Sequence, residues 1–317
     1  MPTRAPQGPR FGLRQVLAGG FMLLALCPAL QAQAWKDAPA YSKEKAQDVL
    51  RRSAFFMPLF GATYPEKFEV LLQTLPANTL RGVVIYNHGC GGQWGWETTV
   101  AQFLYRQGFA VITPEFPTRQ DNQLGCAGST EEESRRSGAQ KAREGIYQAI
   151  NPARLAARGD DNQEVIRWLK ARTRKPILVG GHSEGCRATY AMEISDEQVV
   201  GGICVKQGLQ DSYEHTWRWN TDKPMWQSLE ENDPWVMWGP NTIHTVGFER
   251  KFSQRPGNLT VVRVPGRTHD PLNHPDERNS LTQWLNQRVP TPLVPGANGF
   301  NYESVLPMIH QRLREPR

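Results

Sequence analysis

The sequence predicts an α/β fold in which a mostly parallel central sheet carries helices on both faces. Short segments rich in β-branched residues alternate with segments of helical apolar spacing, and this alternation is typical of βαβ units. Glycine-rich turns directly follow two of the short segments. The 317 residues include 10 Trp, 12 Phe and 8 Tyr, which supply enough bulk for a large core and argue against a disordered chain.

Apolar spacing and boundary residues place the individual elements. Strands are predicted at residues 68–72, 81–86, 109–113, 176–180, 199–205, 224–229 and 259–264. Helices are predicted at residues 43–53, 96–107, 151–169, 186–194, 278–289 and 302–313. Gly108 is suited to cap the second of these helices, and Asn151-Pro152 to begin the third, which we expect to be interrupted near Gly159.

The first 34 residues predict a secretory signal peptide. Three arginines precede an apolar stretch at 16–26, and Ala32-Gln33-Ala34 supplies a small-x-small cleavage pattern. The alternatives are a membrane anchor, for which the stretch is short, and a lipid anchor at Cys27, where Leu26 and Pro28 do not fit the pattern. We expect export to the periplasm or the medium, with no stable membrane insertion after cleavage.

The remaining residues, 35–317, are expected to form a single domain. A polar stretch at about 117–150 breaks the alternation and is expected to be an excursion over the sheet, and residues 290–317 are expected to be a C-terminal extension. Outside the leader the chain has 34 basic and 31 acidic residues, an excess too small to argue for a nucleic-acid partner. No CxxC pair or Cys/His cluster indicates a metal site.

A G-x-S-x-G motif at Gly181–Gly185 lies between a predicted strand and a predicted helix. Small residues flank a serine at such a tight turn, and the turn presents the hydroxyl at the top of the sheet. Ser183 is therefore the candidate nucleophile, although serine at such a position is also a common helix N-cap. We expect His182 beside it to be a packed structural residue.

A serine nucleophile needs a base and a carboxylate that orients the base. In this arrangement the chain order is Ser, then Asp or Glu, then His. His269 follows the last β-rich segment and is the candidate base, with His274 as the alternative. Asp233 follows the preceding strand and is the candidate acid; the weaker candidates are Glu231, Asp211 and Asp270.

Acyl transfer also needs backbone N–H donors for the developing negative charge. The residue after the nucleophile, Glu184, should supply one donor. The loop His88-Gly89-Cys90-Gly91-Gly92 follows a central strand, and the N–H of Cys90 is the expected second donor. Neither a metal ion nor an organic cofactor is implied.

The sequence resembles the α/β-hydrolase superfamily and, within it, the dienelactone hydrolase family. The resemblance spans about residues 80–290 and is carried by these stretches: Asn87–Gly92, Gly108–Glu115, Gly181–Gly185, Asn232–Pro234 and Gly266–His269. It implies a hydrolase of esters or related acyl compounds. The founding dienelactone enzymes use a cysteine nucleophile, whereas this chain has Ser183.

The leading function is therefore an exported serine hydrolase that acts on a small-molecule ester or acyl substrate. The alternatives are a peptidase of the prolyl-oligopeptidase type and a non-catalytic scaffold that binds a ligand or a partner. Four tryptophans lie near the predicted catalytic edge, where they either line a substrate pocket or anchor the loops: Trp94, Trp96, Trp235 and Trp238.

Four cysteines remain after the leader, and an exported protein can oxidise them. Cys90 and Cys126 follow neighbouring central strands, so we expect a disulfide between them at the carboxyl edge of the sheet. Cys186 and Cys204 are expected to be reduced and buried.

Overall fold

The computed structural model describes residues 43–75, 79–89, 95–114, 152–209, 216–231, 233 and 243–290. Their strands form an eight-stranded sheet with the order β2-β1-β4-β3-β5-β6-β7-β8. The strands are β1 (Ala54–Met57), β2 (Gly61–Thr63), β3 (Gly82–Asn87), β4 (Phe109–Thr113), β5 (Ile177–His182), β6 (Val199–Val205), β7 (Met225–Glu230) and β8 (Leu259–Val264).

The six strands from β3 to β8 run parallel, while β1 pairs antiparallel with both β2 and β4. Strand β3 lies between β4 and β5, so the chain adds strands on one side of β3 and then on the other. Ligands of open α/β sheets bind at the carboxyl ends of the strands where such a reversal occurs. The loops after β3 and β5 are therefore the place to look for a site.

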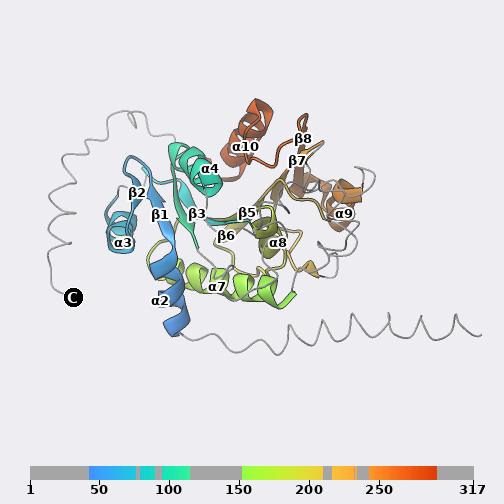
Figure 1. The fold of residues 1–317 in the computed structure, drawn as a ribbon. Helices are drawn as coiled ribbons and strands as arrows, with labels where there is room; N and C mark the ends of the chain where they lie inside the picture. Colours follow the sequence, from blue (N-terminus) through green and yellow to red (C-terminus); the bar gives the residue numbers. More distant parts are fainter. Residues whose placement is uncertain are drawn as a thin grey trace, which may run out of the picture. The chain divides into compact units, whose positions relative to one another are not determined.

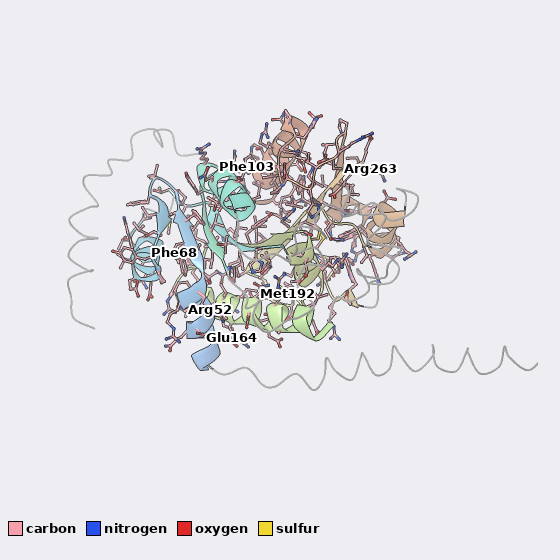
Figure 2. All side chains as sticks on the ribbon, in the orientation of Figure 1. Arg52, Phe68, Phe103, Glu164, Met192 and Arg263 are labelled. Atoms are coloured by element: carbon pink, nitrogen blue, oxygen red, sulfur yellow. A yellow bond between two sulfur atoms is a disulfide. The ribbon has the colours of Figure 1, made fainter. Side chains whose placement is uncertain are left out.

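Helices cover both faces of the sheet (Figure 1). They are α2 (Lys43–Arg52), α3 (Pro65–Thr74), α4 (Gly95–Arg106), α7 (Pro152–Lys170), α8 (Glu184–Tyr190), α9 (Ile243–Lys251) and α10 (Pro275–Arg288). Alternate residues of β3 enter two cores: Val83 and Ile85 pack with α2, α3, α7, α8 and α9, whereas Val84 and Tyr86 pack with α4 and α10. Phe68 of α3 and Phe103 of α4, labelled in Figure 2, belong to these opposite cores.

The predicted α/β architecture is confirmed, and β4, β6 and β8 have the predicted bounds. The strand predicted at 68–72 is wrong, because these residues belong to α3. Pro65 occupies the first turn of α3, and Phe68, Leu71 and Leu72 are buried at helical spacing. The apolar run that suggested a strand is thus one face of a helix.

Other elements differ from the prediction as well. Helix α7 continues through Gly159 without the expected interruption, and strands β1 and β2 and helix α9 were not predicted. Within the described ranges, no helix is long and apolar enough to cross a membrane. The predicted signal peptide, the excursion at 117–150 and the helix at 302–313 lie outside the described residues.

Candidate active site

Ser183 makes the turn between the end of β5 and the start of α8. Its φ of 54° and ψ of −121° lie in a region that a non-glycine residue seldom adopts. A Cβ at Gly181 or at Gly185 would overlap neighbouring backbone atoms, so the turn requires small residues on both sides of the serine. The G-x-S-x-G pattern at this position is therefore explained by the close packing of the turn.

The candidate base and acid contact each other. Asp233 follows β7, and His269 lies in the loop between β8 and α10. The Nδ1–H of His269 donates to Asp233 Oδ2 at 2.6 Å, and both side chains are buried. A carboxylate at Nδ1 fixes the imidazole tautomer that leaves Nε2 able to accept a proton.

His182 supports the backbone of His269. Its Nε2–H donates to the His269 carbonyl oxygen at 2.8 Å, and the two ring centroids lie 4.5 Å apart. Burial, and then the positive charge that His269 can carry, hold the pKa of His182 well below its ordinary value. His182 therefore stays neutral, and its hydrogen bond keeps His269 close to the turn at Ser183.

The loop after β3 approaches the serine turn. Asn87 Nδ2 donates to the Gly180 carbonyl oxygen at 2.9 Å, which joins the ends of β3 and β5. A Cβ at Gly89 would lie 3.6 Å from Ser183 Cβ, so the backbone of this loop passes directly beside the candidate nucleophile. Cys90, the expected donor, lies just beyond the described part of this loop.

Arg158 of α7 connects this loop to the start of α8. Its guanidinium donates to the carbonyl oxygens of His88 and Gly89, both at 3.2 Å, and lies 3.3 Å from Glu184 Oε1. Both side chains of the ion pair are buried. One buried cation thus contacts both segments that are expected to supply oxyanion donors.

The alternative candidates for the base and the acid, and the candidate pocket tryptophans, either have other contacts or lie outside the described residues. His274 caps α10, where its Nδ1 accepts the N–H of Asp276 at 3.2 Å. Glu231 is exposed, and the N–H of Asp270 donates to the Thr268 hydroxyl at 3.4 Å. Asp211, Trp94, Trp235 and Trp238 lie outside the described residues, and of Trp96 the structure describes only its backbone in α4.

Sequence reasoning missed Arg158, Lys206 and Glu230, which surround the candidate site. Lys206 follows the apolar strand β6 directly and is fully buried. A lysine directly after an apolar strand indicates a buried charge and can be recognised in a sequence. Its partners cannot be recognised, because they come from distant parts of the chain. Arg158 lies in a long polar helix and gives no such signal.

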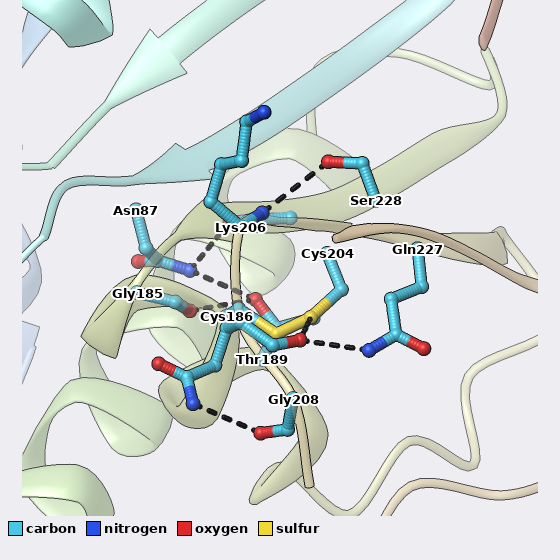
Figure 3. Close-up of a disulfide and its surroundings, with 11 residues drawn as sticks. Asn87, Gly185, Cys186, Thr189, Cys204, Lys206, Gly208, Gln227 and Ser228 are labelled. Carbon is cyan, nitrogen blue, oxygen red and sulfur yellow. Dashed lines mark hydrogen bonds between the residues drawn. A yellow bond between two sulfur atoms is a disulfide. The ribbon is translucent and has the colours of Figure 1, made fainter. Parts of the chain in front are cut away.

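Cys186 and Cys204 are buried as expected, but the prediction that they are reduced is wrong, because the structure joins them in a disulfide (Figure 3). Helix α8 packs against β6, and the two Cα atoms are 4.8 Å apart. The prediction placed Cys186 in a helix and Cys204 in a strand but did not foresee that this helix packs against this strand. Cys90 and Cys126 lie outside the described residues, so their disulfide stays a prediction.

Among the described residues, no group of three or more His, Cys, Asp or Glu side chains is arranged to hold a metal ion.

No protein-family model and no curated protein matches the chain. Among solved structures, it is similar to a cold-adapted esterase from an Arctic intertidal metagenomic library (16% identity, 67% of this chain and 84% of that chain, TM-score 0.44). It is also similar to the esterase domain of a Rhodothermus marinus protein (14%, 74% and 92%, TM-score 0.43) and to a lipase in its open form (14%, 68% and 91%, TM-score 0.43).

The strand order and the turn at Ser183 identify the fold. The strands from β3 onward run parallel, the strand order reverses at β3, and a strained serine lies between a strand and a helix. Together these features are typical of the α/β-hydrolase fold. The chain has the α/β-hydrolase fold.

Proposed function

We propose that this protein is an exported serine hydrolase that cleaves a carboxylic ester through an acyl-enzyme. The buried hydrogen bond of 2.6 Å between His269 and Asp233, beside the strained turn at Ser183, is the observation that carries the proposal. A strained backbone conformation persists only where the surrounding structure enforces it, and such strain is concentrated at functional sites.

In the first half-reaction, Ser183 Oγ attacks the ester carbonyl carbon while His269 Nε2 takes the hydroxyl proton. The carbonyl oxygen becomes an oxyanion, which the N–H groups of Cys90 and Glu184 stabilise. The C–O bond to the alcohol then breaks, and His269 returns the proton to the leaving oxygen. Asp233 stabilises the imidazolium that exists between these two transfers.

In the second half-reaction, water attacks the acyl-enzyme. His269 takes a proton from the water, the Ser183–acyl bond breaks, and His269 returns the proton to Ser183. The net reaction consumes one ester and one water and yields one acid and one alcohol. The substrate class in this proposal is a small ester, and the candidates for the lining of its pocket are Trp94, Trp96, Trp235 and Trp238.

The proposal of export has two supports. The first 34 residues have the pattern of a secretory signal, and the Cys186–Cys204 disulfide is of a kind that persists in oxidising compartments. The compartment is the periplasm or the medium.

The proposal is tested by turnover of p-nitrophenyl esters of increasing acyl length. We expect the wild type to hydrolyse at least the short esters. Ser183→Ala and His269→Ala should each lose at least about three orders of magnitude in kcat/KM, as is usual for members of such a triad. These losses should occur without a change in thermal stability large enough to unfold the protein.

His274→Ala is the matched control, since His274 lies five residues from His269 but caps α10. We expect it to keep kcat/KM within about threefold and to lose about 1 kcal/mol of stability, the ordinary cost of a lost cap. An active His269→Ala together with an inactive His274→Ala would contradict the assignment of the base. Activity on peptides but not on esters would favour the peptidase instead.

A further inference from the structure

The candidate acid and base lie on two separate loops, and one buried residue, Glu230, contacts one loop through its backbone carbonyl oxygen and the other through its carboxylate. Glu230 is the last residue of β7, three residues before Asp233. The N–H of Asp233 donates to the Glu230 backbone carbonyl oxygen at 3.3 Å. The side chain of Glu230 points to the other loop, which connects β8 to α10 and carries His269.

The contacts between Glu230 and this second loop involve the residue that precedes His269. Glu230 Oε1 accepts the backbone N–H of Thr268 at 2.5 Å, and Oε2 accepts the Thr268 hydroxyl at 3.3 Å. A Cβ at Gly266 would overlap the Glu230 carboxylate, so the loop backbone lies directly on it. Asn273, at the far end of the loop, donates to the Thr268 hydroxyl at 2.6 Å.

Lys206 holds the carboxylate of Glu230 in place. Its side chain is 0% exposed, and its Nζ donates to Glu230 Oε2 at 2.6 Å. The same Nζ lies 3.2 Å from Glu277 Oε2 and donates to Asn273 Oδ1 at 3.3 Å. Lys206 directly follows Val205, whose carbonyl oxygen accepts the N–H of Ser183 at 3.0 Å.

Stability alone does not explain this cluster. Removing charges from water costs several kcal/mol per ion, and a well-packed apolar replacement of a buried ion pair is often as stable or more stable. The bonds of Glu230 instead reach the residue that precedes the candidate base and the backbone N–H of the candidate acid. Catalysis depends on such placement, since an error of about 1 Å can cost about a hundredfold in rate.

We propose that Glu230 is a positioning residue that ties the Asp233 loop to the His269 loop, with Lys206 holding its carboxylate. The inference rests on the proposed function, because Asp233 and His269 are the pair it positions. Glu230 acts through the backbone of Thr268 and of Asp233 and does not touch the reacting atoms.

Glu230→Gln tests this role, because an amide has one oxygen. It cannot accept from Thr268 at one position and from Lys206 at the other. Glu277→Gln is the matched control: its single oxygen can stand where Glu277 Oε2 accepts the His274 N–H, at 3.3 Å, and contacts Lys206. Both variants remove one negative charge beside Lys206, but only the first disturbs Thr268.

With p-nitrophenyl acetate we expect Glu230→Gln to lower kcat by about 10- to 100-fold while KM stays within about threefold. Glu277→Gln should keep both constants within about twofold. In proton NMR, the downfield signal of the His269 Nδ1–H that is bonded to Asp233 should shift or broaden in Glu230→Gln and persist in Glu277→Gln. A merely structural role for Glu230 would not alter this signal in a folded variant.

Equal kcat values and equal signals in the two variants would overturn the positioning role while leaving the hydrolase proposal intact. A folded wild type without esterase activity would overturn the hydrolase proposal, and the NMR comparison would still test Glu230. Should Glu230→Gln fail to fold, Thr268→Val serves instead, because it removes the hydroxyl that bonds to Glu230, Asn273 and the N–H of Asp270. That variant should lower kcat several-fold, and wild-type values of kcat and of the signal would overturn the inference.

Discussion

Ser183 and His182 are adjacent in the chain but have opposite constraints. Ser183 is half-buried on a strained backbone, and such a conformation costs about 1–3 kcal/mol unless neighbouring contacts enforce it. His182 is buried in β5 and is held by its hydrogen bond to the His269 carbonyl. The strained backbone of Ser183 is thus adjacent to a residue, His182, that burial and a hydrogen bond hold in place.

The low pKa of His182 makes a prediction about stability and pH. Because burial lowers this pKa in the folded state, the unfolded chain binds a proton that the folded chain does not, between the two pKa values. The contribution of His182 to stability is therefore present above about pH 6.5, the ordinary value, and is lost as the pH falls below it.

Urea denaturation at a series of pH values from 5 to 7.5 measures this effect. His182→Gln keeps an N–H donor for the His269 carbonyl but does not titrate. Between pH 6.5 and 5 we expect the free energy of unfolding of the wild type to fall more steeply than that of the variant, by up to about 1.4 kcal/mol per pH unit. Equal slopes would mean that His182 is not held neutral by the fold.

At the level of elements, the parallel strands β3 to β8 could be predicted from the sequence, whereas the antiparallel strands β1 and β2 could not. Strands buried on both faces appear as continuous apolar runs, which is why β4 and β6 were predicted with the right bounds. Strand β8 lies at the edge of the sheet with only Val264 buried, and its β-branched residues predicted it instead. Strand β1 is four residues long, so it is too short to show a periodic pattern that would identify it as a strand.

The same contrast holds for the candidate site. The order of Ser183, Asp233 and His269 could be predicted because each follows a predicted strand. The contacts of Arg158, Lys206 and Glu230 depend on which loops the fold brings together. A local sequence pattern cannot predict such long-range contacts.

The contact between α8 and the loop after β3 predicts a difference between two glycines. A Cβ at Gly185 would overlap the Asn87 carbonyl oxygen and lie 2.6 Å from that of His88, whereas a Cβ at Gly257 would meet nothing within 4 Å. Gly185→Ala should lower the free energy of unfolding by about 1–3 kcal/mol and move the loop beside Ser183, so that kcat falls as well.

Gly257→Ala, in the short 3-10 turn before β8, should leave both quantities within error of the wild type. Denaturant unfolding and ester turnover measure the two effects. A tolerated Gly185→Ala would show that α8 and the loop do not pack as closely as described.

In the whole molecule, the Cys186–Cys204 disulfide joins the helix after Ser183 to the strand before Lys206. Four cysteines permit three pairings, and the sequence alone does not choose among them. The choice follows from the packing of α8 on β6, which belongs to the tertiary structure.

Peptide mapping without reduction should recover Cys186 and Cys204 in one linked pair. The bridge spans a sequence separation of 18 residues. The chain-entropy model gives such a bridge about 3 kcal/mol of stability, so Cys186→Ala/Cys204→Ala should lower Tm by several degrees. Alkylation of both cysteines in unfolded, unreduced protein that was produced in an oxidising compartment would contradict the pairing.

The central claim, that Ser183 is an activated nucleophile, is tested most directly by a fluorophosphonate probe followed by peptide mass analysis. We predict that the folded wild type gains a single adduct on the peptide that carries Ser183 and that Ser183→Ala gains none. A label that persists in Ser183→Ala, or that maps to another residue, would contradict the claim. A folded wild type that takes no label would instead favour a non-catalytic scaffold.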